Sequence, residues 1–192
     1  MRVTRMSAAF RCATMLALAT SGSGAVAADA PPWKIRIPAH ASIGNAPLAD
    51  THYEFACTTG KGGAISLTLV MPAPEDVKGF PLEDFEGPDG VGGTHKLAEW
   101  SVSAKKPQRA RTPISGWRGV DGDGFLLSTA RESARPSDIA RIARRLLSSE
   151  EARLRLVVKP LKGGAALKVE APIAGHREAV GKVLGPCLTG VK

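Results

Sequence analysis

Apolar and polar residues alternate in two neighbouring stretches of the first half of the chain. Tyr53, Phe55 and Cys57 fall on one side of the first stretch, which starts at Thr51. An alternation with a period of two predicts a strand with one buried face. After a glycine-rich turn at 58–63 the alternation resumes, so these two stretches predict a β-hairpin.

Helical periodicity is confined to the C-terminal half. An amphipathic pattern begins at Pro136, a second hairpin is predicted over 154–169, and a last helix over 174–184 is expected to stop at Gly185-Pro186. Further strands are expected over 97–104, near 112–118 and over 124–129. Strands followed by helix, hairpin and helix predict an α+β fold, with a mainly antiparallel sheet of five to seven strands and two C-terminal-half helices flanking a hairpin.

Two segments lack these patterns. Residues 72–95 contain four prolines and five glycines, and we expect about 24 residues without secondary structure there. Residues 29–50 carry only a short alternation at 33–37 that Pro38 ends, and we interpret them as a lead-in segment. The remaining 51–192 is predicted to form a single domain with a long acidic loop at 72–95.

The N-terminus has the order of a secretory signal. Arg2, Arg5 and Arg11 precede an apolar run over 13–19, and small residues follow up to Ala28. This pattern predicts a cleavable signal peptide over 1–28. The apolar run is shorter than the roughly 20 residues that span a bilayer. We therefore expect a periplasmic or secreted protein without a transmembrane segment.

The net charge narrows the choice of partners. The full chain has a formal charge of +8, and removal of the three signal arginines leaves 23 Lys and Arg against 18 Asp and Glu, or +5. A moderate positive charge favours contact with anionic surfaces or polymers. Nucleic acid is not expected, because the protein is predicted to be exported and its basic residues do not alternate with aromatic ones.

Two cysteines remain after removal of the signal. An even pair in an oxidising compartment indicates a disulfide between Cys57 and Cys187. Closing so long a loop stabilises the fold by roughly 4–5 kcal/mol in the chain-entropy model. The alternative is two unpaired buried thiols.

No motif indicates catalysis. The four histidines have no metal-ligand spacing, and the GxSxG motif does not occur. Asp50, His52 and Glu54 alternate on one strand, where they form either a metal site or, as we prefer, the solvated face of an edge strand. We expect no metal, no cofactor and no catalytic residue, and leave open an enzyme whose site is not visible in local sequence.

The segment 72–95 is the predicted contact for a partner. It contains six acids and only one lysine, whereas the rest of the predicted mature chain is strongly basic. Two aromatic side chains lie among these acids, and aromatic anchors with flanking charges are typical of interfaces. The predicted contact residues are Phe80, Glu83, Asp84, Phe85, Glu86 and Asp89. The alternative is a solvated loop whose phenylalanines pack on the core of the domain.

A second charged region lies in the C-terminal half. The arginines of the predicted helix at 136–147 lie close in sequence to Arg131, Arg135, Arg153 and Arg155. Most of these are expected to form a solvated helix face. The alternative is a contact surface for anionic lipid headgroups or an acidic partner.

The order of elements near the C-terminus resembles a known family. A helix, the hairpin Leu154–Val169, the segment 171–175 and a final helix are similar to the end of small periplasmic proteins of the invasion associated locus B type. The similarity covers about 50 residues, and the Cys57/Cys187 pair differs from the cysteine pattern of that family. It implies an exported accessory or host-interaction protein and assigns no functional residue.

The preferred function is therefore an exported, non-enzymatic protein that binds a protein or cell-envelope macromolecule. It would act as an accessory or host-interaction factor, or as an inhibitor of a basic exported enzyme. The alternative is a small cell-envelope hydrolase.

Overall fold

The computed structural model describes residues 33–61, 63–87, 90–103, 107–120, 124–132 and 136–189. The described residues form one compact unit. The predicted signal peptide at 1–28 and the predicted contact residue Asp89 lie outside the described residues.

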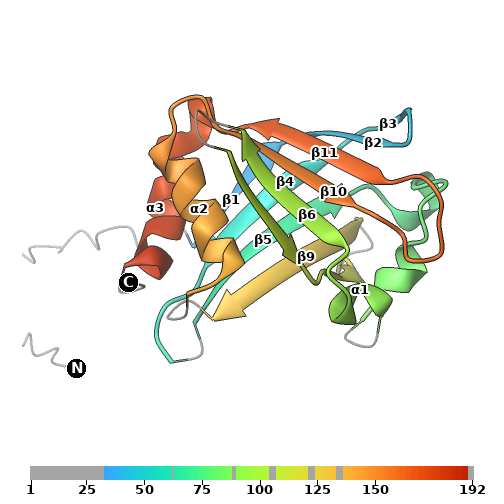
Figure 1. The fold of residues 1–192 in the computed structure, drawn as a ribbon, viewed down its shortest axis with the longest axis horizontal. Coiled ribbons are helices and arrows are strands. Elements are labelled where there is room, and N and C mark those ends of the chain that lie inside the picture. Colours follow the sequence, from blue (N-terminus) through green and yellow to red (C-terminus); the bar gives the residue numbers. More distant parts are fainter. Residues whose placement is uncertain are drawn as a thin grey trace, which may run out of the picture. The chain divides into compact units, whose positions relative to one another are not determined.

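The fold is α+β, as predicted, but its strands form two antiparallel sheets rather than one (Figure 1). The five-stranded sheet has the order β1 (Lys34–Pro38), β4 (His52–Cys57), β5 (Ala64–Met71), β9 (Phe125–Glu132) and β8 (Ser115–Arg118). The six-stranded sheet has the order β3 (Ala46–Leu48), β2 (His40–Ile43), β11 (Leu167–Pro172), β10 (Arg153–Val158), β6 (Ala98–Ser103) and β7 (Gln108–Thr112). Both predicted hairpins are present, as β4–β5 and β10–β11.

The core lies between the two sheets. The ring of Tyr53 on β4 has its centroid 6.1 Å from that of Phe55 and 6.1 Å from that of Trp100 on β6. All three side chains are fully buried. The Tyr53 hydroxyl donates to the carbonyl of Val169 at 3.3 Å, and the Trp100 indole N–H donates to the Thr112 hydroxyl at 3.0 Å. The polar tips of the two largest core aromatics are therefore satisfied where water cannot reach them.

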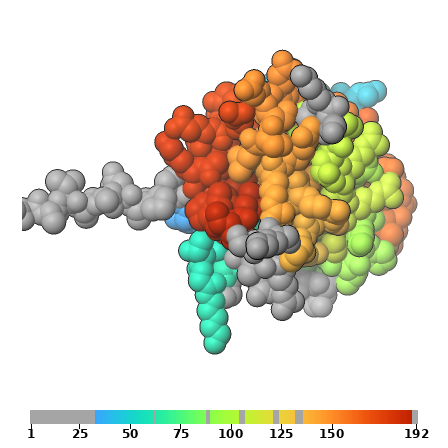
Figure 2. Space-filling view, turned by 60° about the vertical axis from the view of Figure 1, so that its left-hand side comes forward, coloured from blue at the N-terminus to red at the C-terminus, as the bar shows by residue number. Residues whose placement is uncertain are grey.

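Two helices cover one end of the sheets. Helix α2 (Asp138–Ser148) begins where the Ser137 hydroxyl accepts the N–H of Ala140, and its apolar stripe contacts strands of both sheets. Helix α3 (Arg177–Leu188) packs against β1 and β4, after the turn η3 (Ala174–His176). Figure 2 shows α2 (orange) and α3 (red) side by side at this end. The predicted helix–hairpin–helix order is confirmed. No helix in the described ranges is long and apolar enough to cross a membrane.

The last helix ends later than predicted. It continues through Pro186 to Leu188 instead of stopping at Gly185-Pro186. A proline so close to a helix end removes only one backbone bond near the last turn. Cys187 lies in this turn and forms the predicted disulfide with Cys57, with the two Cα atoms 5.9 Å apart. The covalent link therefore holds the extra turn of α3 against β4.

The interpretation of 29–50 as a lead-in segment was wrong. Its described part contributes β1 to one sheet, beside β4, and β2 and β3 to the other, beside β11. The chain passes between the sheets at Ala39, whose N–H donates to the Thr51 carbonyl at 3.0 Å. These strands are short and lie at or near the edges of their sheets. A proline such as Pro38 is tolerated in an edge strand. The alternation of apolar and polar residues in this part of the sequence is therefore weak.

The segment 72–95 is also more ordered than predicted. It contains η1 (Pro74–Asp76), η2 (Leu82–Phe85) and α1 (Val91–Thr94). Phe80 and Phe85 are 5 % and 0 % exposed, and their rings stack with centroids 5.1 Å apart. A Cβ on Gly92 would lie 2.4 Å from the Phe85 ring and 2.4 Å from the Ile114 carbonyl oxygen, so glycine permits this close packing. The segment is therefore packed onto the core by its phenylalanines.

We expect loss of the disulfide to destabilise the fold strongly. The cysteines are 130 residues apart, and a loop of that length corresponds to about 5 kcal/mol in the chain-entropy model. The double variant Cys57→Ala, Cys187→Ala should lower the urea midpoint, and wild type in reducing agent should behave like it. A free energy of unfolding within about 1 kcal/mol of the oxidised protein would contradict this.

We expect Phe85→Ala to lower the free energy of unfolding by about 3–5 kcal/mol, because the ring is fully buried. Glu83→Gln is the matched control, since Glu83 is an exposed residue of the same turn and should change stability by no more than about 0.5 kcal/mol. Denaturant unfolding of both variants tests this. Equal midpoints would mean that the segment is not anchored by its aromatic side chains.

Candidate functional site

The outward side of the six-stranded sheet gathers basic side chains from three strands, β7, β10 and β11. Strand alternation places these residues opposite the core, and the strand registers align them across the sheet. One row across the sheet consists of His40, Glu170, Arg155, Ser101 and Arg109. The neighbouring row consists of Ser42, Lys168, Val157, Glu99 and Arg111. We define the basic face as Arg109, Arg111, Arg153, Arg155 and Lys168, with the acids Glu99 and Glu170 among them.

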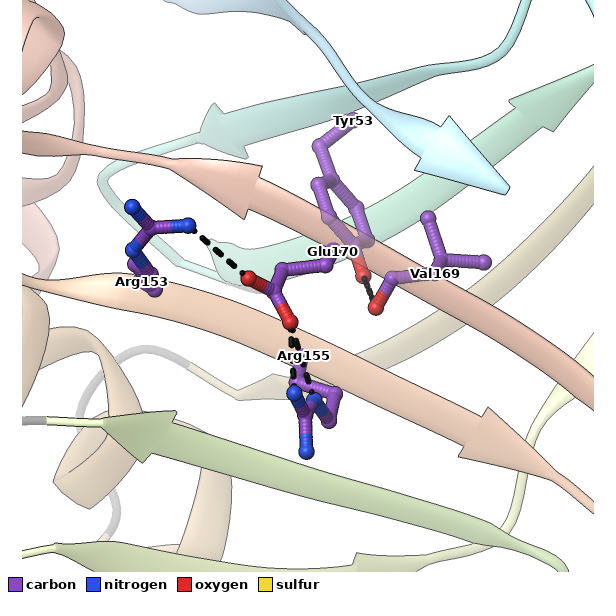
Figure 3. Close-up of polar contacts among 5 residues, drawn as sticks. All are labelled: Tyr53, Arg153, Arg155, Val169 and Glu170. Carbon is purple, nitrogen blue, oxygen red and sulfur yellow. Dashed lines mark hydrogen bonds and ion pairs between the residues drawn. The ribbon is translucent and has the colours of Figure 1, made fainter. Parts of the chain in front are cut away.

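Glu170 holds two of the arginines. Its Oε1 accepts from Arg153 Nη1 at 3.1 Å, and its Oε2 accepts from Arg155 Nη2 at 2.7 Å and Nε at 3.1 Å (Figure 3). The hydrogen bonds from Arg155 are the main reason that the pKa of Glu170 is lowered, and burial opposes them in part. The carboxylate thus stays ionised and orients two guanidinium groups side by side on β10.

The other acid of the face makes a similar pair. Glu99 Oε2 accepts from Arg111 Nη2 at 3.0 Å and from Arg111 Nε at 3.1 Å. Arg109 and Lys168 have no acidic partner among the described residues. The two acids therefore position three arginines without neutralising the face.

The face rests on a buried contact between the sheets. Tyr53 reaches from β4 to the Val169 carbonyl, directly before Glu170 on β11 (Figure 3). Burial, reinforced by the negative charge of Glu170, raises the pKa of Tyr53 well above its ordinary value. The phenol therefore remains protonated and donates at physiological pH, which fixes β11 beneath the face.

A groove of about 420 Å³ crosses the face and is lined by His40, Ser42, Arg155, Val157, Lys168, Val169 and Glu170. Its serine, histidine and glutamate are the residue types of a catalytic triad. Among the described residues, however, no hydrogen bond joins Ser42 to His40 or His40 to Glu170. Both carboxylate oxygens of Glu170 are already bonded to arginines. The groove therefore lacks the linked nucleophile, base and orienting acid that a triad requires.

The predicted contact at 72–95 is not assembled as expected. Phe80 and Phe85 are core residues of this chain, so the proposal of exposed aromatic anchors was wrong. Glu83 and Glu86 are exposed and Asp84 is half-buried, while Glu86 lies 3.7 Å from the Arg118 guanidinium of β8. Glu83 and Glu86 therefore remain at the surface, whereas the two aromatic side chains of the segment are buried.

The expected solvated edge-strand face of Asp50, His52 and Glu54 is not formed. Asp50 lies before β4, and β4 is an inner strand between β1 and β5 on which His52 and Glu54 are half-buried. Glu54 pairs with Arg36 at 3.0 Å and Lys34 at 3.4 Å. Burial, and then the charge of Arg36, lowers the pKa of His52. In the described ranges, no group of three His, Cys, Asp or Glu residues is placed to hold a metal ion.

Sequence analysis singled out Arg153 and Arg155 but missed Arg109, Arg111 and Lys168 as their neighbours. The sequence did contain a local indication of outward-facing arginines. Basic residues alternate with smaller or apolar ones in both Arg153–Val158 and Gln108–Thr112. This alternation does not give the register between strands. Only the pairing of β7, β6, β10 and β11 brings these side chains together.

No family model, curated protein or solved structure matches this chain.

We expect Glu170→Gln to lower stability by about 1 kcal/mol or less, because its ion pairs are partly exposed. The lowered pKa of Glu170 means that its contribution is complete above pH 4.5 and is lost as the pH falls through the folded-state pKa. Melting temperatures between pH 6 and pH 3 should therefore fall less steeply in the variant. Glu150→Gln, at an exposed position, should keep the wild-type slope; identical slopes for all three proteins would contradict the assignment.

Proposed function

We propose that this chain is an exported, non-enzymatic protein that binds an anionic macromolecule through the basic face. The observation that supports this most directly is the alignment of five cations in neighbouring rows on one regular surface. Neighbouring strands are about 4.8 Å apart, and alternate residues of one strand are roughly 6.4–6.8 Å apart. Cations with this regular spacing offer repeated contacts to a polymer whose charges are also regularly spaced. They do not form one enclosed site for a small ion.

The paired acids also favour binding. An arginine held by a carboxylate loses less side-chain freedom when a ligand arrives, because its guanidinium is already oriented. Arg153, Arg155 and Arg111 are held in this way, and each remains more than half exposed as a side chain. Arg109 and Lys168 add charge that no acid of the described residues neutralises. The face therefore combines pre-ordered donors with an excess of positive charge.

The disulfide supports the exported part of the proposal, because such bonds persist in oxidising compartments. The unlinked Ser42, His40 and Glu170 support the non-enzymatic part, since the groove on the face holds no ready nucleophile. An enzyme inhibitor that acts through 72–95 is less favoured, because the phenylalanines of that segment are occupied in the core.

Binding to long-chain polyphosphate, a simple polyanion, tests the proposal. The purified protein should bind it, and the double variant Arg109→Gln, Lys168→Gln should bind at least tenfold more weakly. The slope of log affinity against log salt should fall by about 2, one for each lost phosphate contact. Both proteins should have the same melting temperature, since neither side chain has an ion pair to lose.

The matched control is Lys61→Gln, Arg177→Gln, which removes the same charge from exposed positions outside the face. It should leave affinity within about twofold of wild type. An equal loss in both double variants would mean that net charge alone attracts the polymer, and the basic face would be rejected. Absence of binding at low salt would reject the proposed function itself.

A further inference from the structure

A crevice lies where the chain passes from one sheet to the other. Strand β7 ends at Thr112, and the chain runs through Pro113 and Ile114 into β8 of the five-stranded sheet. Two cavities adjoin here and share Pro113 and Arg131 in their linings. The larger, of about 590 Å³, contains Lys96, Arg111, Ser137 and Asp138 among its lining residues. The smaller, of about 300 Å³, contains Trp117, Ser115, Ser128 and Thr129.

The smaller cavity presents an exposed indole. Trp117 is 45 % exposed and stands on the outward side of β8, opposite Leu126 of β9. Trp33 is also exposed, at 57 %, but the Lys34 ammonium lies 4.9 Å from its ring centroid. No ring or cation contact occupies Trp117 among the described residues. An indole that is partly open to solvent beside polar groups can stack against a ligand.

Hydroxyl groups surround this ring. Ser115 and Ser128 are register partners on β8 and β9, so their side chains share the face that carries Trp117. Ser128 accepts from the Thr68 hydroxyl at 2.8 Å, which leaves its own O–H available to donate elsewhere. The Thr129 hydroxyl belongs to the opposite, core-facing side of β9, where it is buried and has no hydrogen-bond partner among the described residues. The cavity therefore combines one aromatic surface with several short polar groups.

Arg131 forms the wall of the smaller cavity on the side that adjoins the larger cavity. Arg131 is exposed, and its Nη1 donates to the Ala130 carbonyl at 2.7 Å. That bond fixes one edge of the guanidinium and leaves further N–H groups for a ligand. Asp138 in the larger cavity would repel an anion, although it pairs with Arg141. An acidic group is therefore better placed at Arg131 than at the start of α2.

We propose that this crevice binds a segment of an acidic saccharide, with one sugar ring on Trp117 and a carboxylate of the same chain on Arg131. A sugar ring presents C–H groups to the negative face of an indole, and its hydroxyls match the serines. Arginine binds carboxylate through two parallel N–H groups. A peptide fits less well, because Pro113 and Ala130 are the only aliphatic side chains in the described lining of the smaller cavity.

The crevice is continuous with the basic face. Arg111 belongs to that face and also lines the larger cavity, which adjoins the smaller one at Arg131. A chain lying on the basic face can therefore pass Arg111 and place one residue against Trp117. This inference rests on the proposed function and specifies it further, because it makes the anionic macromolecule an acidic polysaccharide.

Affinity for oligogalacturonate and for polyglutamate of matched length tests the inference, since both carry carboxylates and only one is a sugar. Trp117→Ala should weaken oligogalacturonate binding at least tenfold and change polyglutamate binding by less than twofold. Arg131→Gln should weaken oligogalacturonate binding to a similar degree. Trp33→Ala, the control at another exposed tryptophan, should leave both affinities unchanged. Oligogalacturonate should also protect Trp117 from acrylamide quenching in the Trp33→Phe protein.

The outcomes separate this inference from the proposed function. An equal loss of affinity for both ligands in Trp117→Ala would indicate an acidic peptide as the ligand or general electrostatic attraction. Either result would overturn the sugar site. The sugar site would also be overturned if polyphosphate bound through the basic face and oligogalacturonate did not bind. If no polyanion bound, both proposals would fail. Trp117→Phe keeps an aromatic ring and should retain most of the affinity for oligogalacturonate. It is the control for a folding defect in Trp117→Ala.

Discussion

The contact of Tyr53 with Val169 determines how the two sheets face each other. A phenol in a dry core needs a hydrogen-bond partner, since a buried unsatisfied hydroxyl costs about 1–3 kcal/mol. Tyr53 finds that partner on the backbone of the opposite sheet, and its ring lies beside Phe55 and Trp100. A slip of β11 by one residue would break this bond and turn its outward charges into the core. The core contact is therefore consistent with the register that the β10–β11 and β11–β2 ladders give to the basic face.

The arrangement of that face has a consequence for recognition. Charges on a regular sheet are separated by backbone geometry, so their spacing does not depend on flexible loops. Glu99 and Glu170 lie among the arginines and orient them, which favours a repeated ligand over a single enclosed one. The same geometry keeps Ser42, His40 and Glu170 in one groove without joining them by hydrogen bonds.

The acidic segment 72–95 shows how a charge pattern and an apolar pattern can have separate causes. Phe80 and Phe85 are required for packing, because they fix a segment rich in proline and glycine onto the core. Glu83 and Glu86 remain outside, where charged groups avoid the cost of desolvation. Among aromatic residues close to the charged surface, Trp117 is exposed instead. Trp117 is followed by Arg118, and Gly116 before it pairs with Glu86 of the acidic segment, so charges of both signs lie close to this indole.

Several features of this protein were predictable from sequence because their causes are local. The alternation around Tyr53 and over 154–169 specifies strands, the stripe that ends at Leu147 specifies a helix, and two cysteines in a predicted exported chain specify a disulfide. The division into two sheets, the strands within 29–50 and the burial of Phe80 and Phe85 were decided by tertiary packing. So was the grouping of Arg109, Arg111, Arg155 and Lys168, which are up to 59 residues apart in sequence. The local alternation of residues predicts which side of a strand is polar. Only the long-range pairing between strands decides which polar side chains of different strands become neighbours.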